Sequence, residues 1–121
     1  MKVGAEELAM YRATVQDRRE RAKRALDRRQ ARAQEIAHQA ARLLKEQFGA
    51  TRVVLFGSLA RGAFTLWSDV DLAVWGLRPE ETFRAVQAVL GLDAEIKINL
   101  VDIEVCRPAL RAAIEREGRE L

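Results

Sequence analysis

The first third of the chain has the residue spacing of a long helix. No proline or glycine occurs from Ala5 to Phe48, and Ala, Arg, Leu, Glu and Gln, which favour helices, make up most of this stretch. Gly49 follows at a position where it can cap and end the helix. The residues predicted to face a core are Ile36, Ala40, Leu43 and Leu44.

The segment before residue 33 has a thinner apolar stripe. Its apolar positions are Leu8, Tyr11, Val15, Ala22, Ala25 and Leu26. A stripe this thin does not stabilise an isolated helix. Residues 1–33 are therefore predicted to extend the same helix or to form a separate one, and to pack on a partner or on a second copy of the chain.

Beyond Gly49 the pattern changes to short apolar runs separated by turn residues. Strands are predicted at Arg52–Phe56, Val70–Trp75 and Ala94–Val101. Helices are predicted at Leu59–Arg61, from Pro79 to Gly91, and from Pro108 to near Gly118. The inward faces of the last two are predicted to be Phe83, Val86, Val89 and Leu90, and Leu110, Ala113 and Ile114. The order predicts an α/β (α+β) fold in which helices pack on a small sheet.

The polar residues around the first two strands suggest chemistry. Gly57 and Ser58 end the first strand, where free N–H groups and a hydroxyl can hold phosphate oxygens. Ten residues later, Asp69 and Asp71 are two positions apart, so both carboxylates leave the same face of the second strand. Such a pair repels unless a cation lies between its members, and hard oxygen ligands beside phosphate favour Mg²⁺.

Two other interpretations of this segment are weaker. Gly57 and Gly62 have the spacing that opens a P-loop, but Ala63 and Phe64 stand where a P-loop needs Lys and Ser or Thr. A purely structural role would be costly, because aspartates disfavour strands.

The motifs resemble those of the nucleotidyltransferase superfamily typified by DNA polymerase β, and most closely its small branch, the minimal nucleotidyltransferases. The matching segments are Leu55–Gly62 and Ser68–Val74. The resemblance runs from about Ile36 to the C-terminus. It therefore divides the chain into a basic helical extension, residues 1–33, and a nucleotidyltransferase domain, residues 34–121. It implies a short mixed sheet flanked by helices.

The resemblance also implies an activity and a role for each motif residue. The family transfers a nucleotide, usually AMP from ATP, to an acceptor hydroxyl and releases pyrophosphate. Asp69 and Asp71 would hold two Mg²⁺ ions, and Gly57-Ser58 would cradle the β and γ phosphates. Arg61 would neutralise triphosphate charge, and Ser68 would steady the turn at Asp69.

One position departs from the family pattern. Active members carry a third carboxylate on a later strand, and the matching residue here is Asn99. An amide cannot act as a base, although its oxygen can ligate a metal weakly. Asp102 would point to the other face, and Glu95 would lie about 13 Å along the strand. Binding of the Mg–nucleotide is thus predicted to survive, while transfer is predicted to be slow or absent.

The resemblance suggests a partner as well. Minimal nucleotidyltransferases are commonly encoded beside small all-helical HEPN proteins, often RNA-cleaving toxins, for which they act as antitoxins. The leading hypothesis is therefore an antitoxin that transfers a nucleotide to such a partner. The alternative is an inactive module that neutralises its partner by contact. Antibiotic-modifying or tRNA-modifying transferases would need further substrate-binding or RNA-binding domains. Whether the chain forms a homodimer is not decided by the sequence.

Charge is distributed unevenly. The net charge is +3, but Asp17–Arg32 holds eight basic and three acidic residues. This segment, the basic stripe, could bind nucleic acid or an acidic protein. The preferred interpretation is a solvated face with pairs such as Glu20 with Arg24. The reason is that the stripe has no stacking aromatic residue, and Tyr11 lies outside it.

The composition indicates the class of protein and its cellular location. A hydrophobic content of 49% is that of a globular protein. The single Cys106, with no signal-peptide pattern and no membrane-length apolar run, predicts a cytoplasmic protein. The single His38 is assigned no chemistry, and no Cys/His cluster suggests zinc.

Overall fold

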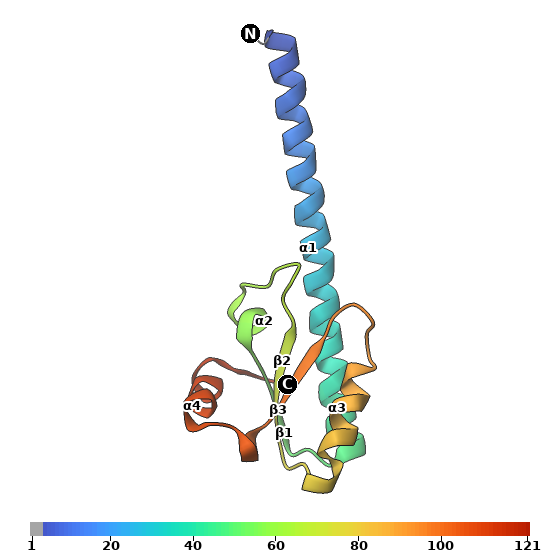
Figure 1. Cartoon of the computed structure of the whole chain (residues 1–121), viewed down its shortest axis with the longest axis vertical. Coiled ribbons are helices and arrows are strands. Elements are labelled where there is room, and N and C mark those ends of the chain that lie inside the picture. The colour runs from blue at the N-terminus through green and yellow to red at the C-terminus, as the bar shows by residue number, and fades with distance from the viewer. Residues whose placement is uncertain (1–3) are drawn as a thin grey trace.

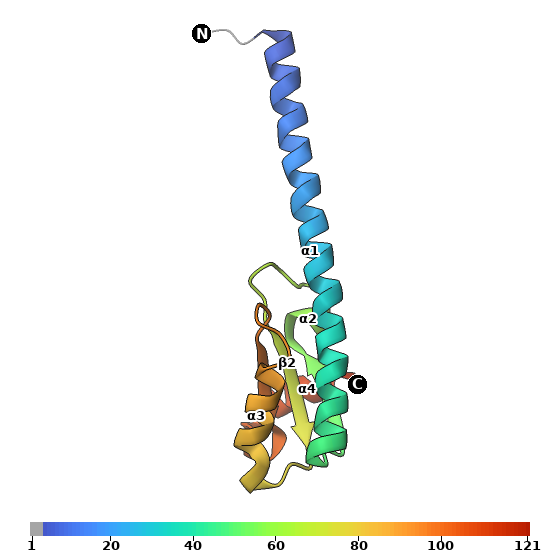
Figure 2. The ribbon, with the colours of Figure 1, turned by 90° about the vertical axis from the view of Figure 1, so that its right-hand side faces the viewer.

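A single long helix organises the molecule. The computed structural model describes residues 4–121, in which α1 (Ala5–Phe48) is one unbroken helix. Its C-terminal half packs against the rest of the chain, whereas its N-terminal half projects away (Figures 1 and 2). Gly49 ends the helix with a φ of 71°, and the N–H of Ala50 donates to the carbonyl of Leu44 at 3.0 Å. Residues 5–32 thus extend the same helix, and positions 1–3 of the predicted extension lie outside the described residues.

The remaining chain forms a four-stranded mixed sheet with helices on both faces. The strands are β1 (Arg52–Phe56), β2 (Val70–Trp75), β3 (Ile98–Asp102) and β4 (Arg119–Glu120). Their order is β3-β2-β1-β4, with β2 and β3 parallel and the other pairs antiparallel. The helices that follow α1 are α2 (Gly57–Arg61), α3 (Thr82–Leu90) and α4 (Pro108–Glu117), with short 3₁₀ turns η1 (Pro79–Glu81) and η2 (Ile103–Val105). The predicted fold class is confirmed.

The two faces of the sheet are covered unequally. One face carries the main core against α1 and α3, built from Val53, Leu55, Leu72 and Val74 of the sheet and Ile36, Ala40, Leu44 and Val89 of the helices. The other face has a small cluster of four buried residues, Val54, Ala73, Ile103 and Ile114. Phe56, Trp75 and Val101 are only half-buried there. This thinly covered face, beside α4, has room for polar side chains.

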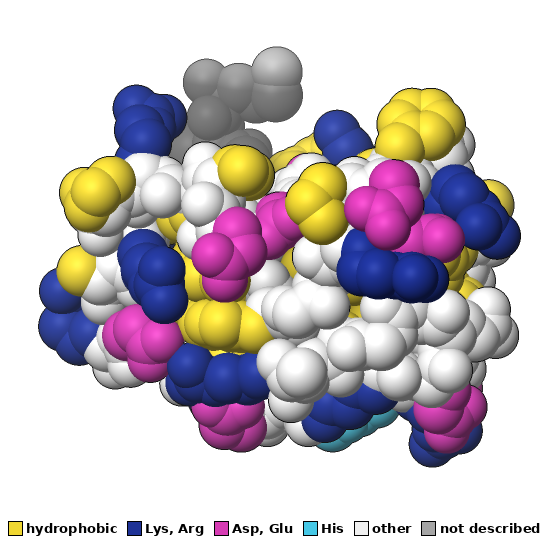
Figure 3. All heavy atoms as spheres, turned by 90° about the horizontal axis from the view of Figure 1, so that it is seen from below, with side chains coloured by type: hydrophobic (Ala, Val, Ile, Leu, Met, Phe, Trp, Pro, Cys, Tyr) yellow, Lys and Arg dark blue, Asp and Glu magenta, His cyan; other side chains and the backbone are white. Residues whose placement is uncertain are grey.

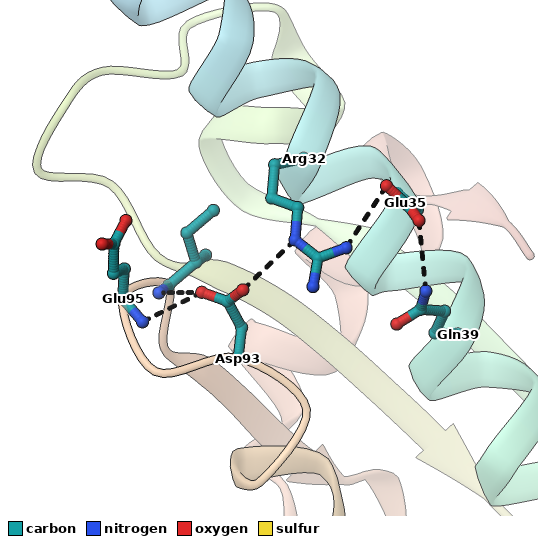
Figure 4. A network of polar contacts seen from close by, with 6 residues as sticks. Arg32, Glu35, Gln39, Asp93 and Glu95 are labelled. Atoms are coloured by element: carbon teal, nitrogen blue, oxygen red, sulfur yellow. Dashed lines mark hydrogen bonds and ion pairs between the residues drawn. The ribbon is translucent and has the colours of Figure 1, made fainter.

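The third strand starts later than predicted. The carboxylate of Asp93 accepts hydrogen bonds from the N–H groups of Glu95 and Ile96 at 2.9 and 2.8 Å, which bends the chain before Ile98. Arg32 of α1 binds the same carboxylate at 3.2 Å and also reaches Glu35 (Figure 4). Because residues 94–97 form this turn, Glu95 and Lys97 do not share a strand face with Asn99.

Other differences concern the edges of the fold. Phe83 is 73% exposed, because α3 starts at Thr82 and turns Ala85 and Val89 inward instead. Leu110 is 38% exposed, since the small cluster under α4 is filled mainly by Ile114. The two-residue strand β4 was not predicted, because Arg119 and Glu120 carry no apolar signal.

The projecting half of α1 makes few contacts with the domain. Apart from a half-buried Val15, side chains from Gly4 to Arg24 are exposed, and Ala33 is the first that is fully buried. The boundary placed after residue 33 stays a prediction. Within residues 4–121, no helix combines the length and the apolar character needed to cross a membrane.

Two glycines provide a matched test of packing beneath α4. An added Cβ at Gly118 would overlap Cγ1 of Val54 and the carbonyl oxygen of Ile114, whereas at Gly91 the nearest atoms are 3.6 Å away. Neither has a positive φ, at −73° and −77°. We expect Gly118→Ala to lower the unfolding free energy by about 1–3 kcal/mol. Gly91→Ala should be neutral or stabilise by up to about 1 kcal/mol. Urea unfolding of both variants measures this, and equal effects would contradict the packing.

Candidate functional site

Three polar side chains converge where β2 and β3 begin. The parallel register places Asp71 opposite Asn99, so both side chains leave the sheet on the face of α4. The amide Nδ2 of Asn99 donates to Oδ1 of Asp71 at 3.1 Å and to Oδ2 of Asp69 at 3.3 Å. The structure therefore brings both predicted carboxylates and the position of the missing third carboxylate into one cluster.

Gly57 closes the cluster from the side of β1. The antiparallel register puts Phe56 opposite Asp71, and Gly57 follows with a φ of 75°. A Cβ built on Gly57 would overlap Oδ2 of Asp71. Two independent reasons thus favour glycine at position 57: the positive φ, and the absence of a Cβ that would collide with the Asp71 carboxylate.

The electrostatics of the cluster leave negative charge only partly compensated. The pKa of the half-buried Asp71 carboxyl is raised above its ordinary value of 3.8, mainly because burial removes water from the charged form. The neighbouring charge of Asp69 also raises this pKa, whereas the hydrogen bond from Asn99 and the charge of Arg61 lower it. A further cation beside these carboxylates would favour their ionised form.

The cluster can provide oxygen ligands for a hard divalent cation. No group of three or more His, Cys, Asp or Glu able to hold a metal occurs within residues 4–121, so the donors are two carboxylates and one amide. As the hydrogen bonds stand, the amide nitrogen of Asn99 faces both carboxylates and has no lone pair for a metal. If the side-chain amide of Asn99 rotated by half a turn, its oxygen Oδ1 would face the two carboxylates in place of the nitrogen. These donors fit Mg²⁺, with one negative charge fewer than three carboxylates would supply.

The other predicted site residues lie around this cluster. Arg61 is exposed, and its Nη1 is 4.0 Å from Oε2 of Glu117. The carbonyl of Ser58 accepts the N–H of Ala63 at 2.9 Å, which closes the turn after α2. Oγ of Ser68 accepts the N–H of Thr65 at 2.9 Å and so fixes the loop that leads into Asp69.

The two acidic residues considered as substitutes for a third carboxylate lie elsewhere. The carboxylate of Asp102 accepts the N–H of Glu104 at 3.1 Å at the start of η2. Glu95 is exposed in the turn before β3. Neither makes a hydrogen bond to the Asp69–Asp71–Asn99 cluster.

One residue that the sequence analysis did not single out is held against the site. Arg29 of α1 donates from Nη2 to the carbonyl oxygen of Ser68 at 3.0 Å, 39 positions away in the chain. Its guanidinium also lies over the ring of Phe64, 5.7 Å from the centroid. One arginine among many in a basic helix gives no sequence signal that would distinguish it.

The contact between Gly57 and Asp71 can be separated from backbone strain. Gly62 has nearly the same φ, 74°, but an added Cβ there would meet nothing within 4 Å. We expect Gly62→Ala to cost about 1–2 kcal/mol for the left-handed backbone alone, and Gly57→Ala to cost more. In an Asp71→Ala background, the cost of Gly57→Ala should fall towards that of Gly62→Ala. Urea unfolding measures this cycle, and an unchanged cost would exclude the contact as its cause.

The raised pKa of Asp71 gives a pH-dependent stability prediction. The folded chain binds this proton more tightly than the unfolded chain, so ionisation lowers stability as pH rises through the folded pKa. Asp71→Asn is neutral throughout and should raise the melting temperature by a few degrees at pH 7 without added metal. The gain should vanish towards pH 3. The exposed Asp17→Asn is the control, and a gain that does not depend on pH would contradict this origin.

Known structures share this architecture. A solved structure of a protein provisionally described as a minimal nucleotidyltransferase is 32% identical, with a TM-score of 0.55, and the match covers 79% of this chain and 95% of that one. A toxin–antitoxin structure with AMP-PNP matches at 24% identity and a TM-score of 0.58, over 69% of this chain and 70% of that one.

A third structure contains a tri-AMPylated Shewanella oneidensis HEPN toxin in complex with an MNT antitoxin. It matches at 22% identity and a TM-score of 0.54, over 73% of this chain and 70% of that one. At these identities, the two toxin–antitoxin structures show a shared fold. A comparison with curated protein sequences gives no match.

The nucleotidyltransferase domain family matches residues 38–119, a range that includes Gly57, Ser58, Asp69, Asp71 and Asn99. With the 32% identical relative, this match confirms the resemblance based on the Gly-Ser and Asp-x-Asp motifs. The chain belongs to the nucleotidyltransferase family.

Proposed function

We propose that this protein binds ATP with Mg²⁺ and transfers AMP to a hydroxyl group of a partner protein of the all-helical HEPN type. The observation that carries the proposal is the convergence of Asp69, Asp71 and Asn99 beside the Gly57 turn. Two carboxylates directed at one point, one of them with a raised pKa, are costly for the fold unless a cation uses them.

Each residue has a part that its position supports. Asp69 and Asp71 would hold the metal, with Oδ1 of Asn99 as a weaker ligand. Bound Mg²⁺ would supply positive charge at the triphosphate during displacement at the α-phosphate. The N–H groups after Gly57 and the Ser58 hydroxyl would bind the terminal phosphates. Arg61, exposed and close enough to lower the pKa of Asp71, would neutralise phosphate charge.

The acceptor proton is the weak point of this chemistry. Asn99 stands where the family's third carboxylate would assist deprotonation, and an amide has no basic lone pair to offer. The carboxylate of Asp102 is engaged at η2. We therefore expect transfer to be slow.

Two observations support a protein partner. The similar structures include toxin–antitoxin complexes, one of them with a HEPN toxin that carries AMP. In this chain, the projecting half of α1 exposes Leu8, Met10 and Tyr11, which are 39%, 71% and 67% exposed. Exposed apolar side chains on a helix are suited to docking on another protein.

A second candidate function follows from the hydrogen bonds of Asn99. Because its amide already donates to both carboxylates, the cluster is partly satisfied without a metal. A module that neutralises its partner by contact, without turnover, would tolerate this arrangement. Transfer of labelled AMP separates the two functions.

The direct test uses purified protein, Mg²⁺ and ATP labelled at the α-phosphate, added to an extract of the source cells. The double variant Asp69→Asn, Asp71→Asn is the control. A labelled protein band that the control lacks is the expected result. Capture of the same partner without label would favour the neutralising module instead.

Restoring the third carboxylate tests the role of Asn99. We expect Asn99→Asp to increase the transfer rate by about 10²-fold or more, because it supplies a base and a charged ligand. It should also tighten Mn²⁺ binding, measured by electron paramagnetic resonance without nucleotide. Asn99→Gln is the matched control and should do neither. A transfer rate that Asn99→Asp leaves unchanged would refute the assignment.

A further inference from the structure

The basic stripe of α1 is less neutralised than its sequence suggests. Within residues 4–121, ion pairs engage only Arg21, with Asp17, and Arg32, with Glu35 and Asp93. The pair anticipated between Glu20 and Arg24 is not among the ion pairs of the described residues, and Glu20 accepts a hydrogen bond from Gln16 instead. Six stripe residues have no ion pair in the described structure, namely Arg18, Arg19, Lys23, Arg24, Arg28 and Arg29, of which Arg29 instead donates to the carbonyl of Ser68. Most of the stripe's positive charge is therefore available to a ligand.

Folding brings a loop that contains an aromatic residue against this stripe. The 62–69 loop lies against α1 in both ribbon views (Figures 1 and 2). Within the loop, Leu66 lines a hollow together with stripe residues, and the carbonyl of Ser68 accepts the hydrogen bond from Arg29. Trp67 lies between these two residues and is 90% exposed. A segment distant in sequence thus brings an exposed aromatic residue to the loop that contacts the stripe.

The exposure of Trp67 is not explained by packing. Tryptophan usually buries most of its large apolar surface. The backbone of Trp67 is nevertheless held in place by the loop. The N–H of Trp67 donates to Oγ1 of Thr65 at 3.2 Å, and the Thr65 hydroxyl is 3.0 Å from Oγ of Ser68. A fixed backbone that presents an open indole ring is a suitable platform for stacking.

A hollow lies between the arginines and Leu66, the residue before Trp67. Its volume is about 530 Å³, and it lies between α1, the 62–69 loop and the turn before β3. The lining residues are Ala25, Arg28, Arg29, Arg32, Leu66, Asp93, Glu95 and Ile96. At this hollow Arg32 pairs with Asp93 and Arg29 donates to the carbonyl of Ser68, whereas Arg28 has no ion pair or side-chain hydrogen bond within the described residues. The far end of the molecule, seen in Figure 3, instead intersperses acidic and basic side chains.

We propose that the basic stripe and Trp67 together form a binding surface for single-stranded nucleic acid. The arginines and Lys23 bind successive phosphates along α1, and an unpaired base stacks on Trp67. A duplex would not offer a free base face to a single exposed ring, so the chemistry selects a single strand. Through Arg29 and Ser68, this surface adjoins Asp69. The proposal is independent of nucleotide transfer, because none of its ligand-binding residues belongs to the Asp69–Asp71–Asn99 cluster.

The test measures binding of fluorescent twelve-nucleotide oligouridine and oligothymidine by anisotropy, without Mg²⁺ or ATP. We expect Trp67→Ala to weaken binding about tenfold, and Trp67→Phe to restore most of it. Arg28→Ala should reduce the slope of log affinity against log salt by about 0.7. Phe83→Ala and Arg84→Ala, at exposed positions on α3, are the matched controls and should bind as the unaltered chain does.

Comparison of the two oligonucleotides shows whether RNA or DNA is preferred, and either preference supports the surface. Absence of binding overturns the proposal, as does an equal loss in the α3 controls. Equal affinity for a duplex, with no effect of Trp67→Ala, would mean that the basic residues attract nucleic acid only by their charge, and it would overturn the proposed single-strand site. Stronger, Trp67-dependent binding of a labelled polyglutamate peptide would assign it to an acidic protein instead.

Discussion

The site depends on the register between β2 and β3. Because the strands are parallel and Asp71 lies opposite Asn99, one amide can reach both carboxylates. The antiparallel partner β1 then ends at Gly57, whose missing side chain leaves the space that the Asp71 carboxylate fills. A shift of one residue in either register would turn Asp71 towards the apolar core of α1. The chemistry is therefore specified by strand pairing before any ligand arrives.

Much of this arrangement could be predicted from local patterns. β1 and β2 have the predicted bounds, since each is a compact apolar run between turn residues. The common face of Asp69 and Asp71 follows from the two-residue period of a strand. Asn99 was identified through the motif rather than the strand pattern. The strand predicted to begin at Ala94 is interrupted because the carboxylate of Asp93 accepts hydrogen bonds from the backbone N–H groups of Glu95 and Ile96.

Long-range contacts between side chains were beyond such reasoning. Arg29 and Ser68 are 39 positions apart, and nothing in either residue's neighbourhood pairs them. The same holds for the loop that carries Trp67, in which Leu66 lines a hollow with Arg28 and Ser68 binds Arg29. The absence of an aromatic residue within the stripe is a statement about chain order alone, whereas the fold brings the loop that carries Trp67 against α1.

The projecting half of α1 determines how the molecule behaves in solution. Twenty helical residues, Ala5–Arg24, form a rod about 30 Å long. A compact chain of this size would have a radius of gyration of only about 14 Å. A rod of this length enlarges the volume that the tumbling protein sweeps, so a monomer leaves a gel-filtration column early, as a heavier particle would. Its rotational diffusion is also anisotropic, faster about the helix axis than end over end. The oligomeric state of such a particle is read from its mass by light scattering, because elution volume reports its shape as much as its size.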